Sequence, residues 1–459
     1  MAMQLRSGRR LVPPPPVPQG GARRCRRRRC PGGDGDGDGE GRISGLPEEL
    51  RLEVLRRVGL RSARDAVRTG VLSRDWRGLW TWLRDLTFDG VDPGMVERAL
   101  GQLRTEQLDR LEISFLERRR LAAARITSLL RAADRLDPAE LVVSLNKDYS
   151  EGPFEVPCFK RATSIDLYIE TLQFTLPPSG NFASLEKLDL MYVTVDLHGL
   201  LPRCPLLRRL SVYYRYLPRC VTTIRSKSLQ ELELSFLYHN HDWSDVDIVA
   251  PELKKFKLQS YTPGEFGLSL SAPKVEEFYL EYTCERFRVG FGEIWRLWSL
   301  KMETECSKRD GQHPRAGVHV LSMEIGPNRG DCPIHRSFEQ EVTWLPVTDY
   351  SVLKLRLKPE GHFNDCSKNC DCDEDSEWKK EQICLPYLEV VEIQGFDVAD
   401  HEVDFLGLLF RSAPMLKKMT IALSWKASSN NERYQKLHSL FEANASVECS
   451  FTKDLMWNI

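Results

Sequence analysis

The sequence has no apolar run long enough to cross a membrane. Its longest apolar stretches are short, such as Phe405 to Phe410, whereas a bilayer-spanning helix needs about 20 apolar residues. The basic N-terminus is followed by prolines rather than by the apolar core of a secretory signal. We therefore expect neither a membrane-spanning nor a secreted protein.

Neither a dominant charge nor a regular cysteine framework is present. The formal net charge is -1 over 459 residues, so no global charge steers the chain toward nucleic acid or a membrane. The 13 cysteines are odd in number and irregularly spaced, which predicts reduced thiols rather than disulfides. These features favour a location in the nucleus, the cytoplasm or both.

Sequence patterns of catalysis are also missing. The chain contains no phosphate-binding loop, no dinucleotide-binding glycine pattern and no nucleophile elbow. The pair His401-Glu402 lacks the second histidine of a zinc-protease helix. The sequence therefore predicts no intrinsic catalysis and no cofactor.

One acidic, cysteine-rich segment, residues 360–384, raises the question of a metal site. Its cysteines are Cys366, Cys370, Cys372 and Cys384. Zinc sites usually contain close pairs such as C-x-x-C, and the spacing C-x-x-x-C-x-C suits tetrahedral chelation poorly. We interpret the segment as a loop inserted between two strands and predict no metal.

Residues 1–41 are of low complexity. They contain a proline run, an arginine cluster over residues 23–29 and an alternating Asp-Gly stretch that lacks the closing glutamate of a calcium loop. With few apolar side chains, the segment is predicted to be disordered. Its arginine cluster is a solvated tail, a nuclear-localisation signal or a nucleic-acid contact.

A compact helical pattern begins at residue 42. Pro47 suits the first position of a helix, and apolar residues follow at i+4 spacing. Ser62 and Asp65 resemble a capping box that starts a second helix. Ser73 is predicted to cap a third helix. The apolar stripe of that third helix consists of Trp76, Leu79, Trp80 and Leu83.

Three helices within about forty residues enclose only a small core. Chains of that size rarely fold alone without disulfides, metals or a partner. The apolar second face of the first helix is therefore either a docking surface for a partner or a contact with the domain behind it. These residues alone leave both interpretations open.

After residue 100 a short L-x-x-L-x-L motif recurs at nearly constant spacing. The clearest copies are Leu185-Leu188-Leu190, Leu207-Leu210-Val212, Leu229-Leu232-Leu234, Leu253-Phe256-Leu258 and Val275-Phe278-Leu280. Weaker copies are Leu108-Leu111-Ile113, Ala162-Ile165-Leu167, Leu297-Leu300-Met302, Val318-Leu321-Met323, Val352-Leu355-Leu357, Leu388-Val391-Ile393 and Leu416-Met419-Ile421. This motif and period are typical of leucine-rich repeats.

Each repeat is expected to add one strand to a curved parallel sheet and to bury its apolar residues against neighbouring repeats. The predicted fold class is α+β: a small three-helix domain over residues 42–85, then an α/β solenoid over residues 100–384. Target binding is expected on the concave face of the solenoid and on loops at the ends of its strands. Plausible aromatic anchors are Tyr192, Tyr213, Tyr214, Tyr238, Trp243, Tyr261 and Tyr282.

The helical segment resembles the plant F-box motif along its whole length. The matching stretches are Leu46 to Leu50, Val54-Leu55, Asp65 to Thr69, Val71 to Trp76 and Leu79-Trp80. The resemblance implies binding to a Skp-family adaptor, which links to cullin and RING subunits. The adaptor face implied by position consists of Leu46, Pro47, Leu50, Val54, Leu55, Leu72, Trp76 and Trp80. Glu48 stands where the motif usually has aspartate, and Arg57-Val58 replace an aromatic residue or leucine.

Residues 385–459 resemble the FBD region of plant F-box proteins. The resemblance lies in Leu385 to Ile393, Gly395-Phe396, His401 to Val403, Leu406 to Phe410 and Ala413 to Met419. These stretches are expected to form strand, amphipathic helix and strand, which would continue and cap the solenoid. With both resemblances the chain is identified as a member of the plant F-box/LRR/FBD family.

Membership of this family implies the substrate-recognition subunit of an SCF-type (Skp, cullin and F-box) ubiquitin ligase. The F-box would bind the adaptor, the repeats would hold an unknown target protein, and the partners would transfer ubiquitin. The alternative is a repeat-based interaction scaffold without a ligase role. We expect neither a membrane nor a nucleic acid as a partner.

Overall fold

The structure is a computed structural model, and the chain divides into Met1–Leu46 and the compact unit Pro47–Ile459. It describes residues 45–59, 62–115, 122–145, 152–169, 173–216, 222–238, 244–260, 266–283, 289–291, 295–305, 318–327, 336–337, 345, 349–358, 383–424 and 431–453. The predicted disordered tail and nearly all of the acidic, cysteine-rich loop lie outside these ranges, so both remain predictions.

The helical segment starts as predicted and then becomes irregular. Its elements are α1 (Glu48–Gly59), α2 (Ala63–Arg68) and the 3-10 turns η1 (Thr69–Val71), η2 (Arg74–Trp76) and η3 (Leu79–Trp82). Helix α2 follows Ser62, but the Ser62 side chain makes no capping hydrogen bond, so the predicted capping box is wrong. Ser73 does cap, since its Oγ accepts the Asp75 N–H at 3.3 Å.

The third predicted helix is replaced by the two short turns η2 and η3. Gly78 separates them with a φ of 79°, in the left-handed region where other residues are strained. A continuous α-helix cannot pass through that conformation. The apolar stripe of Trp76, Leu79, Trp80 and Leu83 is nevertheless buried.

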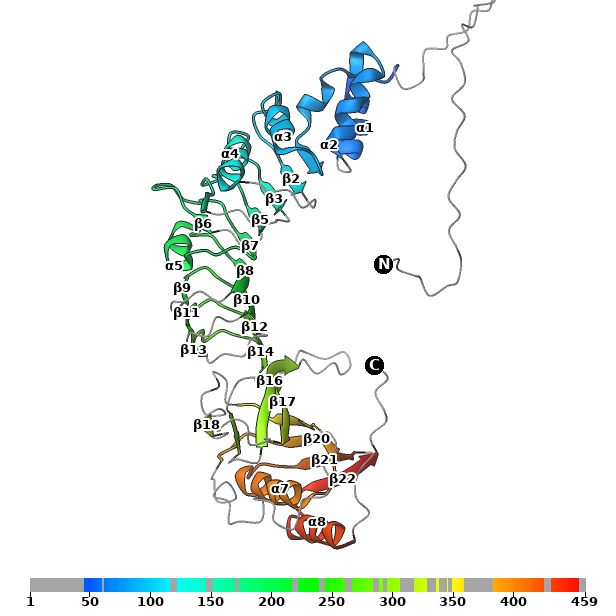
Figure 1. Cartoon of the computed structure of the whole chain (residues 1–459), viewed down its shortest axis with the longest axis vertical. Coiled ribbons are helices and arrows are strands. Elements are labelled where there is room, and N and C mark those ends of the chain that lie inside the picture. The colour runs from blue at the N-terminus through cyan, green and yellow to red at the C-terminus, as the bar shows by residue number, and fades with distance from the viewer. Residues whose placement is uncertain are drawn as a thin grey trace, which may run out of the picture. The chain divides into compact units, whose positions relative to one another are not determined.

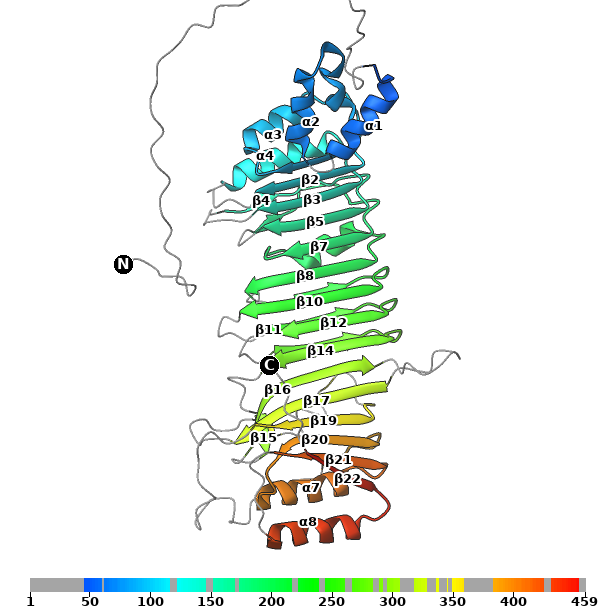
Figure 2. The ribbon, with the colours of Figure 1, turned by 90° about the vertical axis from the view of Figure 1, so that its right-hand side faces the viewer.

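The main body is a sheet of stacked parallel strands (Figure 2). From the helical segment onward the strands are β1 (Asp85–Asp89), β2 (Arg110–Phe115), β3 (Glu140–Leu145), β5 (Ser164–Ile169), β7 (Lys187–Met191), β8 (Arg209–Tyr216), β10 (Glu231–Tyr238), β12 (Lys255–Ser260) and β14 (Glu277–Thr283). Each pairs with the next in parallel. This order confirms the predicted leucine-rich-repeat solenoid.

The repeat motif places its apolar residues in register. Leu188 of β7 aligns with Leu210 of β8, which aligns with Leu232 of β10 and through it with Phe256 of β12. All four are buried, while the residues between them in each strand alternate toward the other side of the sheet. A period of two is expected for a strand with one buried face.

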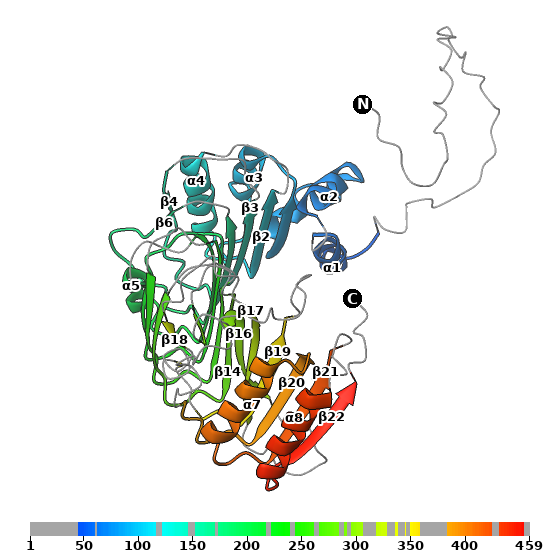
Figure 3. The same ribbon diagram turned by 60° about the horizontal axis from the view of Figure 1, so that its bottom comes forward.

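Short helices and strands occupy the return segments. They are α3 (Pro93–Leu100), α4 (Ala123–Asp134), β4 (Phe154–Glu155), β6 (Phe174–Thr175), α5 (Leu197–Leu200), η4 (Leu201–Arg203), β9 (Thr222–Arg225), β11 (Ser244–Val249) and β13 (Phe266–Ser271). Figure 3 shows α3 and α4 together on one side of β2 and β3. Their apolar faces, for example Val96 and Ile126, complete the core of the first repeats.

The parallel succession is interrupted once. Strand β15 (Val289–Phe291) forms an antiparallel hairpin with β16 (Trp295–Glu305), and β16 is also antiparallel to β14 and to β17 (Val318–Pro327). The motif at 297–302 was expected in a parallel strand. Residues 292–294 alone join β15 to β16, and so short a link cannot make the crossover of a parallel pair. The apolar residues of this motif are buried all the same.

The C-terminal region returns to parallel pairing (Figure 1). Its strands and helices are β18 (Arg336–Ser337), β19 (Val352–Leu357), β20 (Val390–Phe396), α7 (Asp400–Ser412), β21 (Lys418–Leu423), α8 (Asn431–Ala443) and β22 (Glu448–Lys453). Strands β17, β19, β20, β21 and β22 pair in parallel. The predicted strand, helix and strand after residue 385 are confirmed. No helix in the described ranges is long and apolar enough to cross a membrane.

Candidate functional site

Helix α1 turns one stripe inward and another toward solvent. Leu55 is fully buried, and one turn earlier the Arg51 side chain is 15% exposed, with its Nη1 atom 3.8 Å from a carboxylate oxygen of Asp75. Leu50 and Val54 are exposed. Because residues four apart share a helix face, the helix has a buried Arg51/Leu55 stripe beside an exposed Leu50/Val54 stripe.

The eight residues predicted to contact an adaptor divide into two groups. Pro47, Leu50, Val54 and Leu72 are exposed, and Leu46 is half-buried. In the core lie Leu55, Trp76 and Trp80. A side chain covered by its own domain supports a surface rather than forming it, so the core group can hold the surface group in place. Adaptor contact by either group stays a prediction.

Three further exposed apolar side chains lie in the same segment and escaped the sequence analysis. They are Val67, Val71 and Trp82, and Val71 is 85% exposed. Val71 ends the short turn η1, directly after Gly70. An apolar residue at such a turn is the signal that could have revealed it.

Half of the large apolar side chains that are exposed in the described part of the chain fall between residues 50 and 82. We call this group, Leu50, Val54, Val67, Val71, Leu72 and Trp82, the F-box surface. Exposed apolar side chains are normal when scattered singly, whereas their concentration in a small segment is typical of an interaction surface.

Charged pairs accompany the F-box surface. Glu53 lies 3.7 Å from Arg56 and 3.3 Å from Arg57, and Asp65 lies 3.3 Å from Arg68. These exposed pairs contribute little stability, about 0–1 kcal/mol each. Apolar side chains interspersed with polar ones are the usual composition of a protein–protein interface.

A second surface lies on the sheet, on the side that alternates with the buried rows; we call it the open face. Across β5, β7 and β8 the aligned residues are Asp166, Asp189 and Ser211 in one row, and Tyr168, Met191 and Tyr213 in the next. Both carboxylates, both tyrosines and the methionine are half-buried. The open face therefore combines negative charge with aromatic side chains.

The seven predicted aromatic anchors differ in burial, and some of them lie outside the described residues. Tyr214 and Tyr282 are buried, because their positions in β8 and β14 belong to the inward rows, so their assignment as surface anchors is wrong. Tyr192 and Tyr213 are half-buried. The remaining three, Tyr238, Trp243 and Tyr261, have side chains outside the described residues and stay predictions.

The pair His401-Glu402 has a structural role at the start of α7. Glu402 is buried, and its Oε2 atom accepts the backbone N–H groups of Asp397 and Ala399, each at 2.9 Å. Burial raises the pKa of Glu402 to about 8 against the opposing effect of these donors. Burial also lowers the pKa of His401. Glu402 thus satisfies the free N–H groups at a helix N-terminus.

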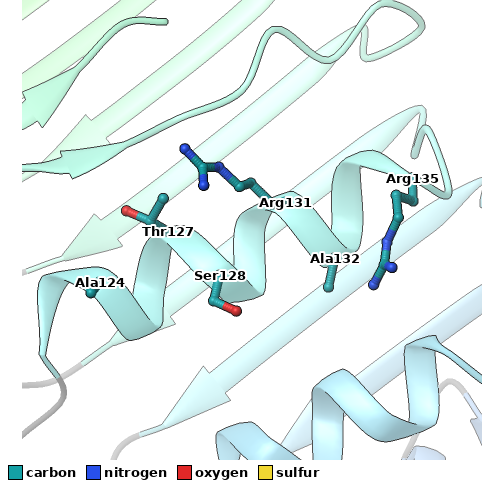
Figure 4. A pocket seen from close by; sticks show the side chains of 6 residues that line it. All are labelled: Ala124, Thr127, Ser128, Arg131, Ala132 and Arg135. Atoms are coloured by element: carbon teal, nitrogen blue, oxygen red, sulfur yellow. The ribbon is translucent and has the colours of Figure 1, made fainter.

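An open hollow of about 710 Å³ lies along α4 (Figure 4). It is lined by Ala124, Thr127, Ser128, Arg131, Ala132 and Arg135. Arg131 pairs with Glu155 at 3.1 Å, and the Thr127 hydroxyl accepts the Glu155 N–H at 3.0 Å. These contacts tie α4 to β4 beside the hollow.

Four cysteines lie in the described ranges. Cys158, Cys204, Cys384 and Cys449 are free thiols. Burial raises the pKa of Cys204 to about 12, which keeps it protonated and unreactive. The residues that the structure describes contain no group of three His, Cys, Asp or Glu side chains able to hold a metal ion.

Comparisons with known proteins agree with this architecture. A family model described as FBD-associated F-box protein At5g56370, LRR repeats, matches residues 127–287, and the FBD model matches residues 384–421. FBD-associated F-box protein At3g52670 of Arabidopsis thaliana is 27% identical over 428 residues, covering 88% of this chain and 94% of that protein. F-box/FBD/LRR-repeat protein At1g13570 of the same plant is 25% identical over 416 residues, covering 83% and 91%. No solved structure matches significantly.

The stacked strands and the matched repeats define a leucine-rich-repeat protein. The FBD match falls on β20, α7 and β21, and the relatives are named for the same combination of F-box, repeats and FBD. The chain therefore has the leucine-rich repeats and the FBD region of plant F-box/LRR/FBD proteins, and it is similar to such proteins along most of its length.

Proposed function

We propose that this chain is the substrate-recognition subunit of an SCF-type ubiquitin ligase. In this role the F-box surface binds a Skp-family adaptor, and the repeats bind the protein to be ubiquitinated. The observation that supports the proposal best is the gathering of exposed apolar side chains between residues 50 and 82, directly before the first strand of the solenoid. The names of the relatives support it as well.

The F-box surface is apolar enough to provide a stable contact. Full burial of one large apolar side chain contributes about 1.5–3 kcal/mol. Several side chains of the F-box surface covered by one partner would therefore offset a substantial part of the cost of association. The buried Leu55, Trp76 and Trp80 lie behind it and fix its shape.

The chain itself is proposed to carry out no chemistry. Ubiquitin transfer would be performed by the partners, and this subunit would supply proximity and orientation of the target. We further propose that it acts in the nucleus, the cytoplasm or both, which a fluorescent fusion in plant cells would test. Exclusive localisation to the secretory pathway would contradict this placement.

The test is capture of a Skp-family adaptor and cullin by the full chain, beside a Leu50→Ala, Leu72→Ala variant. Both side chains are exposed, so the variant should fold like the native chain and lose most of the adaptor signal. The matched control is Tyr387→Ala, Met415→Ala, which removes two equally exposed apolar side chains from the C-terminal region.

Capture by the native chain and the control, lost in the F-box variant, supports the ligase role. Folded native protein that captures no adaptor contradicts it and favours the alternative, a repeat-based scaffold. Equal loss in the control and the F-box variant would show that the capture depends on apolar surface in general, which also contradicts the proposal.

A further inference from the structure

The open face holds a group of residues with a specific chemistry in the middle of the sheet. We call Asp166, Tyr168, Asp189, Met191, Tyr192 and Tyr213 the acid–aromatic patch. Its members come from β5, β7, the residue after β7, and β8, and strand register sets them side by side. The patch lies within residues 127–287, the region matched by the repeat model.

Two carboxylates face each other in the patch without full neutralisation. Asp166 and Asp189 are direct register partners on neighbouring strands. Lys187 pairs with Asp189 at 2.6 Å, whereas Asp166 forms no ion pair with any residue that the structure describes. Burial, and then the charge of Asp189, raise the pKa of Asp166. Like charges directly opposite each other destabilise a sheet, so this arrangement favours an added cation.

Aromatic side chains stand beside the two carboxylates. Tyr168 lies two residues after Asp166, and therefore on the same face of β5. The ring of Tyr192 meets that of Tyr168 edge-on, with ring centroids 5.4 Å apart and an interplanar angle of 73°. A carboxylate next to an aromatic face can hold a lysine or arginine by an ion pair and a cation–π contact together.

One residue of the acid–aromatic patch, Tyr192, has a strained backbone conformation. Tyr192 has a φ of 60°, in the left-handed region that only glycine adopts freely, and its N–H donates to the Tyr213 carbonyl at 2.6 Å. A regular strand would turn the residue after Met191 toward the buried side. The left-handed conformation brings its ring against Tyr168 instead, and strain of this kind is often kept where a residue has a binding role.

Negative charge predominates in the inner rows of the open face. Its two inner rows, from β1 to β14, contain the carboxylates of Asp89, Glu112, Asp166, Asp189, Glu233 and Glu281, and one cation, Lys257. The outermost row mixes acids with bases. Arg209 pairs with Glu231 of the same row at 2.6 Å, whereas Arg110 and Lys187 pair with the inner-row acids Glu112 and Asp189. Charge complementarity therefore selects a cationic partner segment.

From these observations we infer that the acid–aromatic patch binds an extended, arginine- or lysine-bearing segment of the target protein. The inference rests on the proposed function, since it names the chemistry of the target that a receptor would hold. The row that contains Asp166 and Asp189 has carboxylates from β2 to β10, a distance of five strand spacings or about 24 Å. An extended segment of about seven residues spans that distance.

The experiment measures binding of a fluorescent peptide of alternating arginine and glycine to the full chain, with a glutamate-for-arginine peptide beside it. Two variants probe the patch: Asp166→Asn and Tyr192→Gly. Both should fold, because the first removes a like-charge contact and the second suits the left-handed φ. The matched control is Glu277→Gln, which removes one carboxylate from the same sheet at β14, outside the patch.

We expect saturable binding of the arginine peptide, none of the glutamate peptide, and weakening with rising ionic strength. Each patch variant should weaken binding by about tenfold, equivalent to about 1.4 kcal/mol, with the control unchanged. Absence of binding to the native chain overturns the inference. So does equal weakening by Glu277→Gln, which would reveal general attraction between opposite charges.

Adaptor capture, measured on the same preparations, separates the two proposals. None of these substitutions touches the F-box surface. Intact capture without peptide binding would discard the acid–aromatic patch as a target site and leave the receptor role standing. Peptide binding without capture would keep the patch as a binding surface and discard the ligase role.

Discussion

The helical segment and the repeats bury apolar side chains in different ways. In the repeats an inner strand such as β10 has a neighbour on both sides, so Leu234 is enclosed between Val212 of β8 and Leu258 of β12. In the helical segment the short elements enclose Trp76 but leave Leu72, four residues earlier, exposed. A stacked array completes its own core, whereas a small segment leaves apolar surface for a partner.

The largest expected effect tests whether these regions unfold separately. Trp76→Ala should destabilise the helical segment by about 3–5 kcal/mol, because it removes a side chain that is 1% exposed from a small core. Hydrogen exchange should then rise over residues 48–82 and stay slow in β5 to β14. Leu234→Ala, the matched change in the repeats, should raise exchange in β8, β10 and β12. The same pattern for both variants would show that the two regions unfold together.

A second prediction concerns one backbone position of the FBD region. Gly395 in β20 has a φ of 75°, and a Cβ atom there would lie 2.5 Å from the Leu357 carbonyl oxygen of β19. Gly395→Ala should therefore cost about 2 kcal/mol or more, combining conformational strain with this clash. Thermal unfolding checks the value. An unchanged melting temperature would mean that the β19–β20 pair relaxes, and that this part is less tightly packed than the repeats.

A third prediction uses the pH dependence of stability. The pKa of folded Glu402 is about 8, above its ordinary value of 4.5, so the folded chain keeps a proton that the unfolded chain releases. This contribution is fully present below about pH 4.5 and is lost as pH rises through about 8. Relative to Glu402→Gln, the native chain should lose stability across that window, up to the roughly 5 kcal/mol that the full pKa shift corresponds to. Parallel pH profiles of the two proteins would exclude a proton on Glu402.

The smallest expected effect is on the stability of the F-box surface variant. Leu50→Ala, Leu72→Ala should change the free energy of unfolding by about 0.5 kcal/mol or less, since both side chains are already exposed. Chemical denaturation measures it. A loss of several kcal/mol would show that these residues pack against the protein itself, and it would remove the contrast between the two regions.

The position of the candidate site could be predicted from local sequence pattern. Which of its side chains are buried and which are exposed could not. The i+4 stripe predicted α1 correctly, and the plant F-box resemblance pointed to residues 46–80. The division between exposed Leu72 and buried Trp76 depends on the break at Gly78 and on the turns η2 and η3. Spacing within a regular helix cannot describe such a break.

Strand β1 shows a related limit. Leu83, Leu86 and Phe88 fit the repeat motif, yet Leu83 also fits the stripe of the expected third helix, and β1 was missed. Strands β3 and β22 were missed because Pro138 and Ser446 replace the first leucine of the motif. The predicted boundaries of the three domains were not tested and stay predictions.

The sequence by itself determined the class of fold, because the repeat motif is local, its period is nearly constant, and each copy buries the same positions. The tertiary structure alone decided the reversed direction of β16, the exposure of Val71 and the meeting of Asp166 with Asp189. Each of these depends on which segments become neighbours in space, and residues 23 positions apart, as these two aspartates are, acquire a common environment only when their strands pair.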